Sequence, residues 1–350
     1  MKMPRLYHDI LAQPESLARV LHYQIVAGRE KLEEAGHALR SGRRIVITGM
    51  GASMYAAIPL EYQLCALGLN AMVVESGELL HYRLGACEDS VVVLVSRSGE
   101  SVEISMLLEK IRGKCVTIGV SNEPQSRLAL QVDHSIHVAS PADEMVAIQT
   151  YTGTVLALHL LAGAAACTFD ATAAEAGAAI EALRPAIAAG SQALEQWDTF
   201  LRFAPPVCNL GRGPSCGSAL EASLLFNETA KVPAMGMAAA SFRHGPVEQV
   251  NDRFVGFVFA PMGRTRALNI ALARDLGRFG GHVRVIGPVG EDTTGLDLCE
   301  VPAISEALAP LVEIIPVQYA ALRLAHLRGL EIGRFFYTPQ VTLDEAAFVR

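Results

Sequence analysis

Short apolar runs alternate along this chain with longer segments in which apolar residues recur every three or four positions. The runs predict buried strands and the periodic segments predict helices. Two of the predicted strands lie at the start of the segments 45–57 and 207–219. The others are residues 90–95, 114–120, 134–138, 254–260, 282–287 and 299–301. The predicted helices include residues 14–39, 102–111, 265–279 and 307–328. Apolar strands that alternate with helices predict an α/β fold with mostly parallel, doubly wound sheets.

An internal repeat divides the chain. Gly49, Gly51 and Ser53 follow one apolar run, and Gly211, Gly213 and Ser215 follow the other at matching positions. The later strands of the two halves come in the same order, so the sequence predicts two copies of one α/β module. The predicted domains are residues 29–170 and 197–335, with an N-terminal segment 1–28, a helical linker 171–196 and a C-terminal tail 336–350.

Charge and composition narrow the choice of partners. The formal net charge is −7 and no cluster of Lys and Arg is present, which argues against a nucleic-acid partner. A small phosphorylated ligand stays compatible, because main-chain amides and hydroxyls can hold it. The seven cysteines form no C-x-x-C pair, and no apolar leader or membrane-length apolar run is seen. We therefore expect a cytoplasmic protein without a metal, a cofactor or a membrane partner.

The segment Ser96–Ser101, which reads S-R-S-G-E-S, follows a predicted strand and precedes a predicted helix. Its three hydroxyls and one glycine would face the positive end of the helix dipole, which favours an anion. The alternative is an ordinary helix cap and turn, in which Ser and Gly are common. Because doubly wound sheets bind ligands at such strand ends, we favour a ligand loop.

Acid–base candidates lie in the second half. Glu221 and Glu228 are seven residues apart on one predicted helix, so we expect them to share a face. Helix glutamates are more often simply exposed, but the apolar positions between these two suit a carboxylate of raised pKa. His244 lies in an H-G-P turn, and loops carry function more often than helix faces do.

Together these segments resemble the sugar isomerase (SIS) domain family, whose members include phosphosugar isomerases, deaminases and deglycases. The resemblance begins at Asp9–Pro14, which reads D-I-L-A-Q-P, and includes the S-x-S-G-E-S loop. Its most specific part is the series L-G-R-G, A-L-E, E and H-G-P between residues 210 and 246. It implies two tandem SIS modules, a phosphosugar or amino-sugar phosphate as ligand, and a homodimer with shared active sites.

The resemblance also implies roles for the candidate residues. Ser96, Ser98 and Ser101 would bind the sugar phosphate, and Arg97 is at the variable position of the loop. Ser53, in the segment 45–57, would also contribute to phosphate binding.

The same resemblance implies that Glu228 moves the proton between C1 and C2 of the open-chain sugar. His244 would assist ring opening from a neighbouring subunit, and Glu221 matches another glutamate of the family's site. The expected reaction is aldose–ketose isomerisation, deamination or deglycation through an enediol or enolamine.

Two positions depart from the family pattern. Leu225 and Pro339 stand where the family's glucosamine-6-phosphate synthases have lysines. The pattern of that family's glutaminase domain is not found, so glutamine is not expected as the ammonia source. These departures favour substrates whose C1–N bond is cleaved, and they leave open a second possibility, a non-catalytic phosphosugar sensor.

Overall fold

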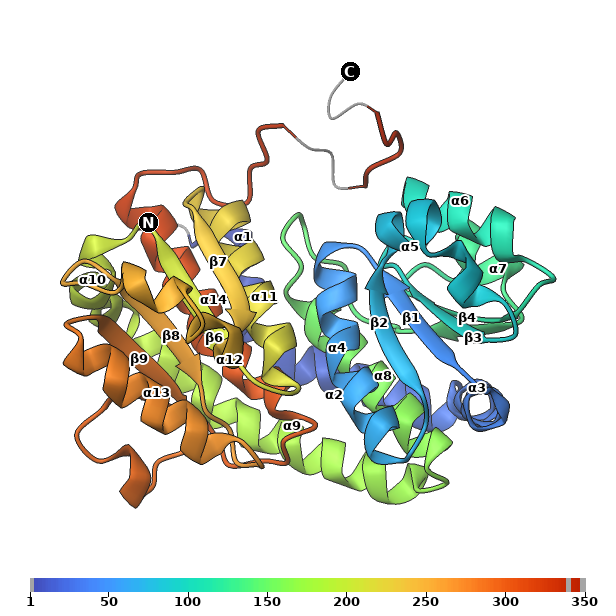
Figure 1. Ribbon diagram of the computed structural model, residues 1–350, viewed down its shortest axis with the longest axis horizontal. Coiled ribbons are helices and arrows are strands. Elements are labelled where there is room, and N and C mark those ends of the chain that lie inside the picture. Colours follow the sequence, from blue (N-terminus) through green and yellow to red (C-terminus); the bar gives the residue numbers. More distant parts are fainter. Residues whose placement is uncertain (1–2, 338–340, 347–350) are drawn as a thin grey trace. The chain divides into compact units, whose positions relative to one another are not determined.

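The computed structural model describes residues 3–337 and 341–346 and divides the chain into two compact units. The N-terminal unit comprises Glu15–Ala178 with Phe335–Arg350, and the C-terminal unit comprises Met1–Pro14 with Ala179–Arg334. Each unit is built around one five-stranded sheet, and Figure 1 labels the elements along the chain.

The sheet of the N-terminal unit has the order β2-β1-β3-β4-β5, and all of its strands are parallel. Its strands are β1 (Ile45–Gly49), β2 (Ala71–Glu75), β3 (Val91–Val95), β4 (Val116–Ser121) and β5 (His134–His137). The helices of this part of the chain are α2 (Gln13–Val26), α3 (Arg29–Ser41), α4 (Gly51–Ala66), α5 (Ser76–Tyr82), η1 (Leu84–Cys87), α6 (Val102–Ile111), α7 (Arg127–Gln131) and α8 (Gln149–Ala165).

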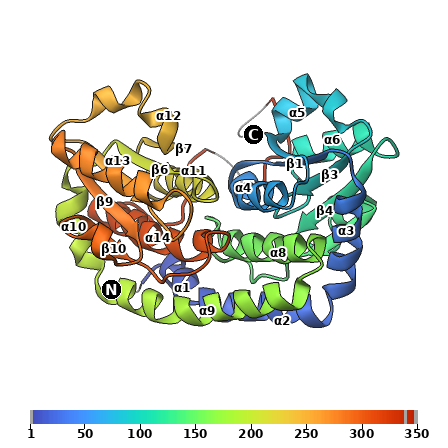
Figure 2. The same cartoon turned by 60° about the horizontal axis from the view of Figure 1, so that its bottom comes forward.

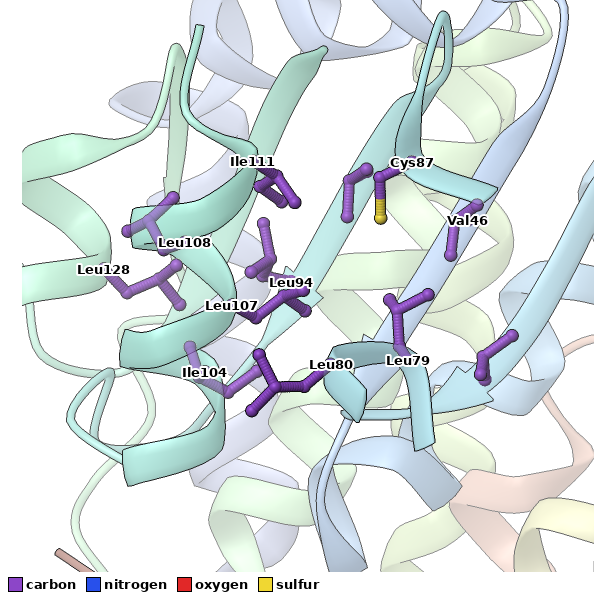
Figure 3. Close-up of a cluster of buried hydrophobic side chains, with 12 residues drawn as sticks. Val46, Leu79, Leu80, Cys87, Leu94, Ile104, Leu107, Leu108, Ile111 and Leu128 are labelled. Carbon is purple, nitrogen blue, oxygen red and sulfur yellow. The ribbon is translucent and has the colours of Figure 1, made fainter. Parts of the chain in front are cut away.

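Helices cover this sheet on both faces because alternate strand residues point to opposite sides and both sides are apolar. Val46 and Leu94 face α5 and α6, where they belong to a buried cluster with Leu79 and Leu107 (Figure 3). Val92 belongs to the same cluster. On the other side α4 and α8 lie side by side, and every residue of α8 is buried (Figure 2).

The C-terminal unit repeats this architecture. Its sheet has the order β10-β9-β8-β6-β7, which read from β7 is the order of the first sheet. The strands are β6 (Val207–Gly211), β7 (Ala234–Ala238), β8 (Val255–Phe259), β9 (His282–Gly287) and β10 (Asp297–Glu300). Its helices are α1 (Arg5–Leu11), α10 (Trp197–Phe200), α11 (Ser215–Leu225), α12 (Ala239–Phe242), α13 (Arg266–Arg278) and α14 (Ala309–Leu327), with short turns η2 (Leu194–Gln196), η3 (Leu201–Phe203), η4 (Phe226–Ala230), η5 (Pro246–Gln249) and η6 (Glu291–Thr293).

The predicted α/β fold and the repeat are confirmed, and the differences are local. One helix was predicted for residues 14–39, but the structure has α2 and α3, which are separated at Ala27 and Gly28. Two strands, β2 and β7, were missed. The predicted linker is largely helical, because α9 (Phe169–Gln192) spans most of it and connects the two units.

Both ends of the chain return to the unit formed by the other half. Gln13 donates a buried hydrogen bond of 2.7 Å from Nε2 to Gln318 Oε1 on α14 in the C-terminal unit. At the other end, the main-chain N–H of Val102 donates to the Thr342 carbonyl at 3.0 Å in the N-terminal unit. The predicted domain ranges, which follow the chain without these returns, stay predictions. Among the described residues, no helix is both long and apolar enough to cross a bilayer.

Candidate functional site

The strand pairing brings two loops of the N-terminal unit together. β1 and β3 are neighbours, and Gly49 pairs with Val95 at the end of both strands. The chain therefore enters α4 and the segment Ser96–Ser101 at the same edge of the sheet. Ser53, in the first turn of α4, accepts a hydrogen bond on its hydroxyl from the Arg97 main-chain N–H at 3.3 Å.

The serine hydroxyls of this segment contact other groups of the same loop. Ser96 Oγ is buried, accepts from the Gly99 N–H at 3.1 Å and lies 3.4 Å from Ser101 Oγ. Ser98 Oγ accepts from the Glu100 N–H at 3.2 Å. Ser101 is the N-cap residue of α6, yet its side chain makes no capping hydrogen bond. The loop thus gathers hydroxyls at the positive end of α6, where an anion is stabilised.

Gly99 is required by the backbone of this loop. Its φ is +67°, in the left-handed region that favours glycine. A Cβ at this position would also lie 2.2 Å from Ser126 Oγ, which is too close for two non-bonded atoms. A side chain at residue 99 would therefore force the loop away from its neighbour.

The loop that follows β4 is hydrogen-bonded to Ser96–Ser101, which we call the serine loop. The Asn122 N–H donates to the Arg97 carbonyl at 2.9 Å, and the Leu128 N–H donates to the Gly99 carbonyl at 3.2 Å. Glu100 Oε1 accepts from the Arg127 N–H at 2.6 Å. Several main-chain hydrogen bonds therefore hold the loop in a preformed shape, which suits ligand binding without reordering.

Asp143 is a supporting residue that the sequence analysis missed. Its buried carboxylate accepts main-chain N–H bonds at 2.9 to 3.0 Å at the start of α8, from Ile148, Gln149 and Thr150. It anchors the segment that contains Met145, whose carbonyl accepts from the Arg97 guanidinium at 3.4 Å. A lone Asp shortly before an apolar helix was the only available signal.

The C-terminal tail reaches the same loop region. The Thr342 carbonyl accepts from the Val102 N–H in the first turn of α6, and Glu345 Oε1 lies 2.6 Å from His81 Nε2 on α5. Pro339, which stands at a family lysine position, lies outside the described residues.

Glu228 lies on irregular backbone in the C-terminal unit. The α-helix α11 ends at Leu225, and residues 226–230 form the π-helical turn η4, so Glu228 is half-buried on that turn rather than on the helix. The prediction of one continuous helix is therefore wrong at Glu228, because five-residue hydrogen bonding changes the angular step per residue. Glu221 remains on α11 and is 1% exposed. Short π-helical turns of this kind are frequent at functional sites.

Lys231 directly follows this turn and was not identified from the sequence. Its φ is +53°, an unusual left-handed conformation for a residue with a side chain. Its Nζ donates to the main-chain carbonyl of Glu228. Burial lowers the pKa of the Lys231 amine below its ordinary value, against the opposing attraction of the Glu228 carboxylate. Leu225, which stands at a family lysine position, is only 1% exposed and packs in the core.

His244 lies exposed on the turn between α12 and η5. Its main-chain N–H donates to the Ser241 carbonyl at 3.0 Å, and the next residue, Gly245, has a φ of +128°. The structure therefore presents the imidazole on a surface turn, and its role in a partner subunit's site stays a prediction.

In the N-terminal unit, Ser53 and the loop Ser96–Ser101 together form what we call the serine cradle. In the C-terminal unit, side chains of the chain itself fill the corresponding place. Ser215, the repeat partner of Ser53, donates from Oγ to Glu313 Oε2 at 3.0 Å, and Ser218 donates to Oε1 at 2.6 Å. Burial raises the pKa of Glu313 to about 7, the two hydroxyls oppose the rise, and Glu306 adds to it. The Arg264 N–H donates to Glu306 Oε2 at 3.3 Å in the loop that matches the serine loop. In the C-terminal unit, the carboxylate of Glu313 therefore occupies the loop that corresponds to Ser53, and the carboxylate of Glu306 occupies the loop that corresponds to the serine loop.

Two surface hollows lie elsewhere. One, of about 420 Å³, is lined by residues around Arg29 and Asp170, and the other, of about 500 Å³, is lined by residues around Leu194 and Arg323. Neither contains a residue of the predicted site. Within the described residues, no group of three His, Cys, Asp or Glu side chains is arranged to hold a metal ion.

Comparisons with known proteins agree with this architecture. Residues 38–164 match the family model described as the SIS domain. The glutamine–fructose-6-phosphate aminotransferase [isomerizing] of Pyrobaculum aerophilum is 29% identical over 335 residues, which cover 92% of this chain and 54% of that protein. The chain spans about half the length of the curated relatives it matches.

Solved structures extend the likeness to the whole chain. A tagatose-6-phosphate ketose/aldose isomerase of Escherichia coli matches with a TM-score of 0.81 at 18% identity, over 95% of this chain and 96% of its own. A glucosamine-6-phosphate deaminase of Thermotoga maritima matches with a TM-score of 0.74 at 19% identity, over 97% and 99%. Residues 38–164 of this chain are therefore an SIS domain, and the chain as a whole is similar in sequence to part of the isomerizing glutamine–fructose-6-phosphate aminotransferases and shares its fold with stand-alone phosphosugar isomerases and deaminases.

Proposed function

We propose that this protein is a phosphosugar isomerase or an amino-sugar-phosphate deaminase or deglycase. The observation that carries the proposal is the difference between its two modules. The serine cradle of the N-terminal unit offers hydroxyls and a helix N-terminus, whereas Glu306 and Glu313 fill the corresponding loops of the C-terminal unit. The phosphate would therefore be held by Ser53, by the loop Ser96–Ser101 and by its Arg97.

Glu228 is the proposed base. In an open-chain phosphosugar, the hydrogen on the carbon beside the carbonyl is acidic. When it leaves as a proton, the carbonyl oxygen takes up the negative charge that would otherwise remain on carbon. Glu228 would remove this proton and return it to the neighbouring carbon, with Glu221 as a further carboxylate of the site. Cleavage of a C1–N bond needs the same proton transfer, so fructosamine phosphates are included among the proposed substrates.

Hydrogen exchange tests the proposal. The protein is incubated in deuterated water with fructose 6-phosphate, glucosamine 6-phosphate or fructosamine 6-phosphate, and label at C1 or C2 and released amine are measured. Glu228→Gln should abolish labelling and preserve binding in a thermal-shift assay, because the amide keeps the shape but cannot accept the proton. Glu195→Gln, an exposed carboxylate on η2, is the matched control. If the wild-type protein binds a phosphosugar but incorporates no deuterium into it, the result would instead support a non-catalytic phosphosugar sensor.

A homodimer with shared sites follows from the proposed role of His244. Glu228→Gln and His244→Gln proteins should each be inactive. When the two are unfolded and refolded together in equal amounts, about a quarter of wild-type activity should return, because half of the dimers would carry one intact site. No recovery from mixed dimers would place both residues in a site made by a single chain.

A further inference from the structure

Close to Glu228, the sequence lacks the lysine that glucosamine-6-phosphate synthases have three residues before the corresponding glutamate. Leu225 occupies that position within the core. Lys231 is the only lysine after position 114 of the chain. It follows Glu228 by three residues, the turn before it is π-helical, and its amine contacts the main chain of the proposed base.

The backbone at Lys231 folds the side chain back over the turn. The left-handed conformation is unfavourable for a residue with a Cβ, and strained residues of this kind cluster at sites where the strain serves function. The result here is the contact of Nζ with the Glu228 carbonyl, which holds a positive charge beside the residue that would carry out the proton transfer. Burial also shifts the Lys231 amine towards easier proton release.

We propose that Lys231 is a catalytic residue whose ammonium stabilises and protonates the sugar oxygen that becomes negative as Glu228 removes the carbon-bound proton. This inference rests on the proposed function. In the step, the C–H bond breaks and its proton passes to the Glu228 carboxylate, while the C–H electron pair forms the carbon–carbon double bond. The carbonyl π pair moves to oxygen, which takes a proton from Lys231. Glu228 then gives its proton to the former carbonyl carbon, which bonds it with the electron pair of the carbon–carbon double bond. The hydroxyl on the other carbon passes its proton to the neutral Lys231 amine, and its O–H electron pair forms the new carbonyl, which completes the isomerisation.

Three variants separate this role from a structural one. Lys231→Met removes the charge, and Lys231→Arg keeps a charge that does not titrate near neutral pH. Lys231→Gly removes the amine and relieves the left-handed backbone, so it should fold with an unfolding midpoint at or above that of the wild type. Lys114→Met removes an exposed lysine between α6 and β4 and is the matched control.

Deuterium exchange is measured for each variant across pH. We expect Lys231→Met and Lys231→Gly to lose roughly 100-fold in kcat/KM for exchange, the loss typical of one donor to a developing oxyanion. Lys114→Met should match the wild type. Wild-type exchange should fall on the alkaline side as Lys231 deprotonates, and Lys231→Arg should lack this fall. Exchange within a few-fold of wild type in both Lys231→Met and Lys231→Gly would overturn the inference.

A second measurement does not depend on turnover. The amines of the chain are converted to ¹³C-dimethylamines and titrated by NMR, with Lys231→Met used to assign the Lys231 signal. That signal should titrate below the other lysines and move lower still in Glu228→Gln, because the carboxylate favours the charged form. Titration together with the exposed lysines would overturn the inference. A wild-type protein that exchanges no label would instead overturn the proposed function.

Discussion

Replacement of Glu313 by Gln should stabilise the C-terminal unit at neutral and alkaline pH. Glu313 is fully buried on α14, and its partners are the hydroxyls of Ser215 and Ser218. A glutamine fits the same space, since its carbonyl can accept from one hydroxyl and its amide can donate to the other. The substitution therefore removes a buried charge without leaving a polar group unsatisfied.

The magnitude follows from the pKa of Glu313. Burial raises it from 4.5 to about 7. Between these two values the folded protein holds a proton that the unfolded chain has released, so stability falls as pH rises through the window and levels off above pH 7. At ~1.4 kcal/mol for each pH unit, ionised Glu313 costs about 3 kcal/mol relative to the protonated form.

The fluorescence of Trp197 measures this effect in the relevant unit. It is the only tryptophan of the chain, is 1% exposed and packs on Phe257 of β8. Urea unfolding followed by this signal should show little difference between the wild type and Glu313→Gln at pH 5. The variant should be more stable by about 3 kcal/mol at pH 8.

Two variants make the result decisive. Glu306→Gln should move the wild-type pH window to lower values, because Glu306 is the neighbouring charge that raises the pKa of Glu313. Glu195→Gln, at an exposed position, should leave the pH profile unchanged. Parallel pH profiles for the wild type and Glu313→Gln would refute the reasoning, because they would show that Glu313 does not titrate in this range.

Two further predictions concern the serine cradle. Gly99→Ala should weaken binding of inorganic phosphate and fructose 6-phosphate at least about tenfold in calorimetry, because its Cβ would lie 2.2 Å from Ser126 Oγ. Gly113→Ala, at a φ of +76° with no atom within 4 Å of the added Cβ, isolates the backbone cost, and equal effects of the two substitutions would contradict the predicted clash. Asp143→Ala should destabilise the N-terminal unit by roughly 3 kcal/mol through lost hydrogen bonds to a charged acceptor, and should also weaken phosphate binding by freeing the segment that contacts Arg97. Hydrogen exchange of the α8 amides measures the first effect, and unchanged protection would argue against Asp143 as the anchor.

The sequence by itself determined the central strands, the repeat and the serine loop. Central strands such as β3 and β8 are buried on both faces, so they appear as continuous apolar runs. The edge strands β2 and β7 are only partly buried, and β7 contains alanine, methionine and glycine without a β-branched residue. A strand of that kind has no local pattern, and its pairing with β6 depends on residues distant in the chain.

The tertiary structure alone decided which parts of the candidate site are open, filled or strained. Ser53 and Ser215 occupy matching positions in the two repeats, yet only Ser215 is taken by a carboxylate, which comes from a helix 98 residues further along the chain. Likewise, helical periodicity continues through Glu228, but the structure has a π-helical turn there and a left-handed Lys231 after it. Periodicity reports which face of a segment is buried. The groups that meet at a site depend on contacts between segments far apart in sequence, and on backbone torsions that packing imposes.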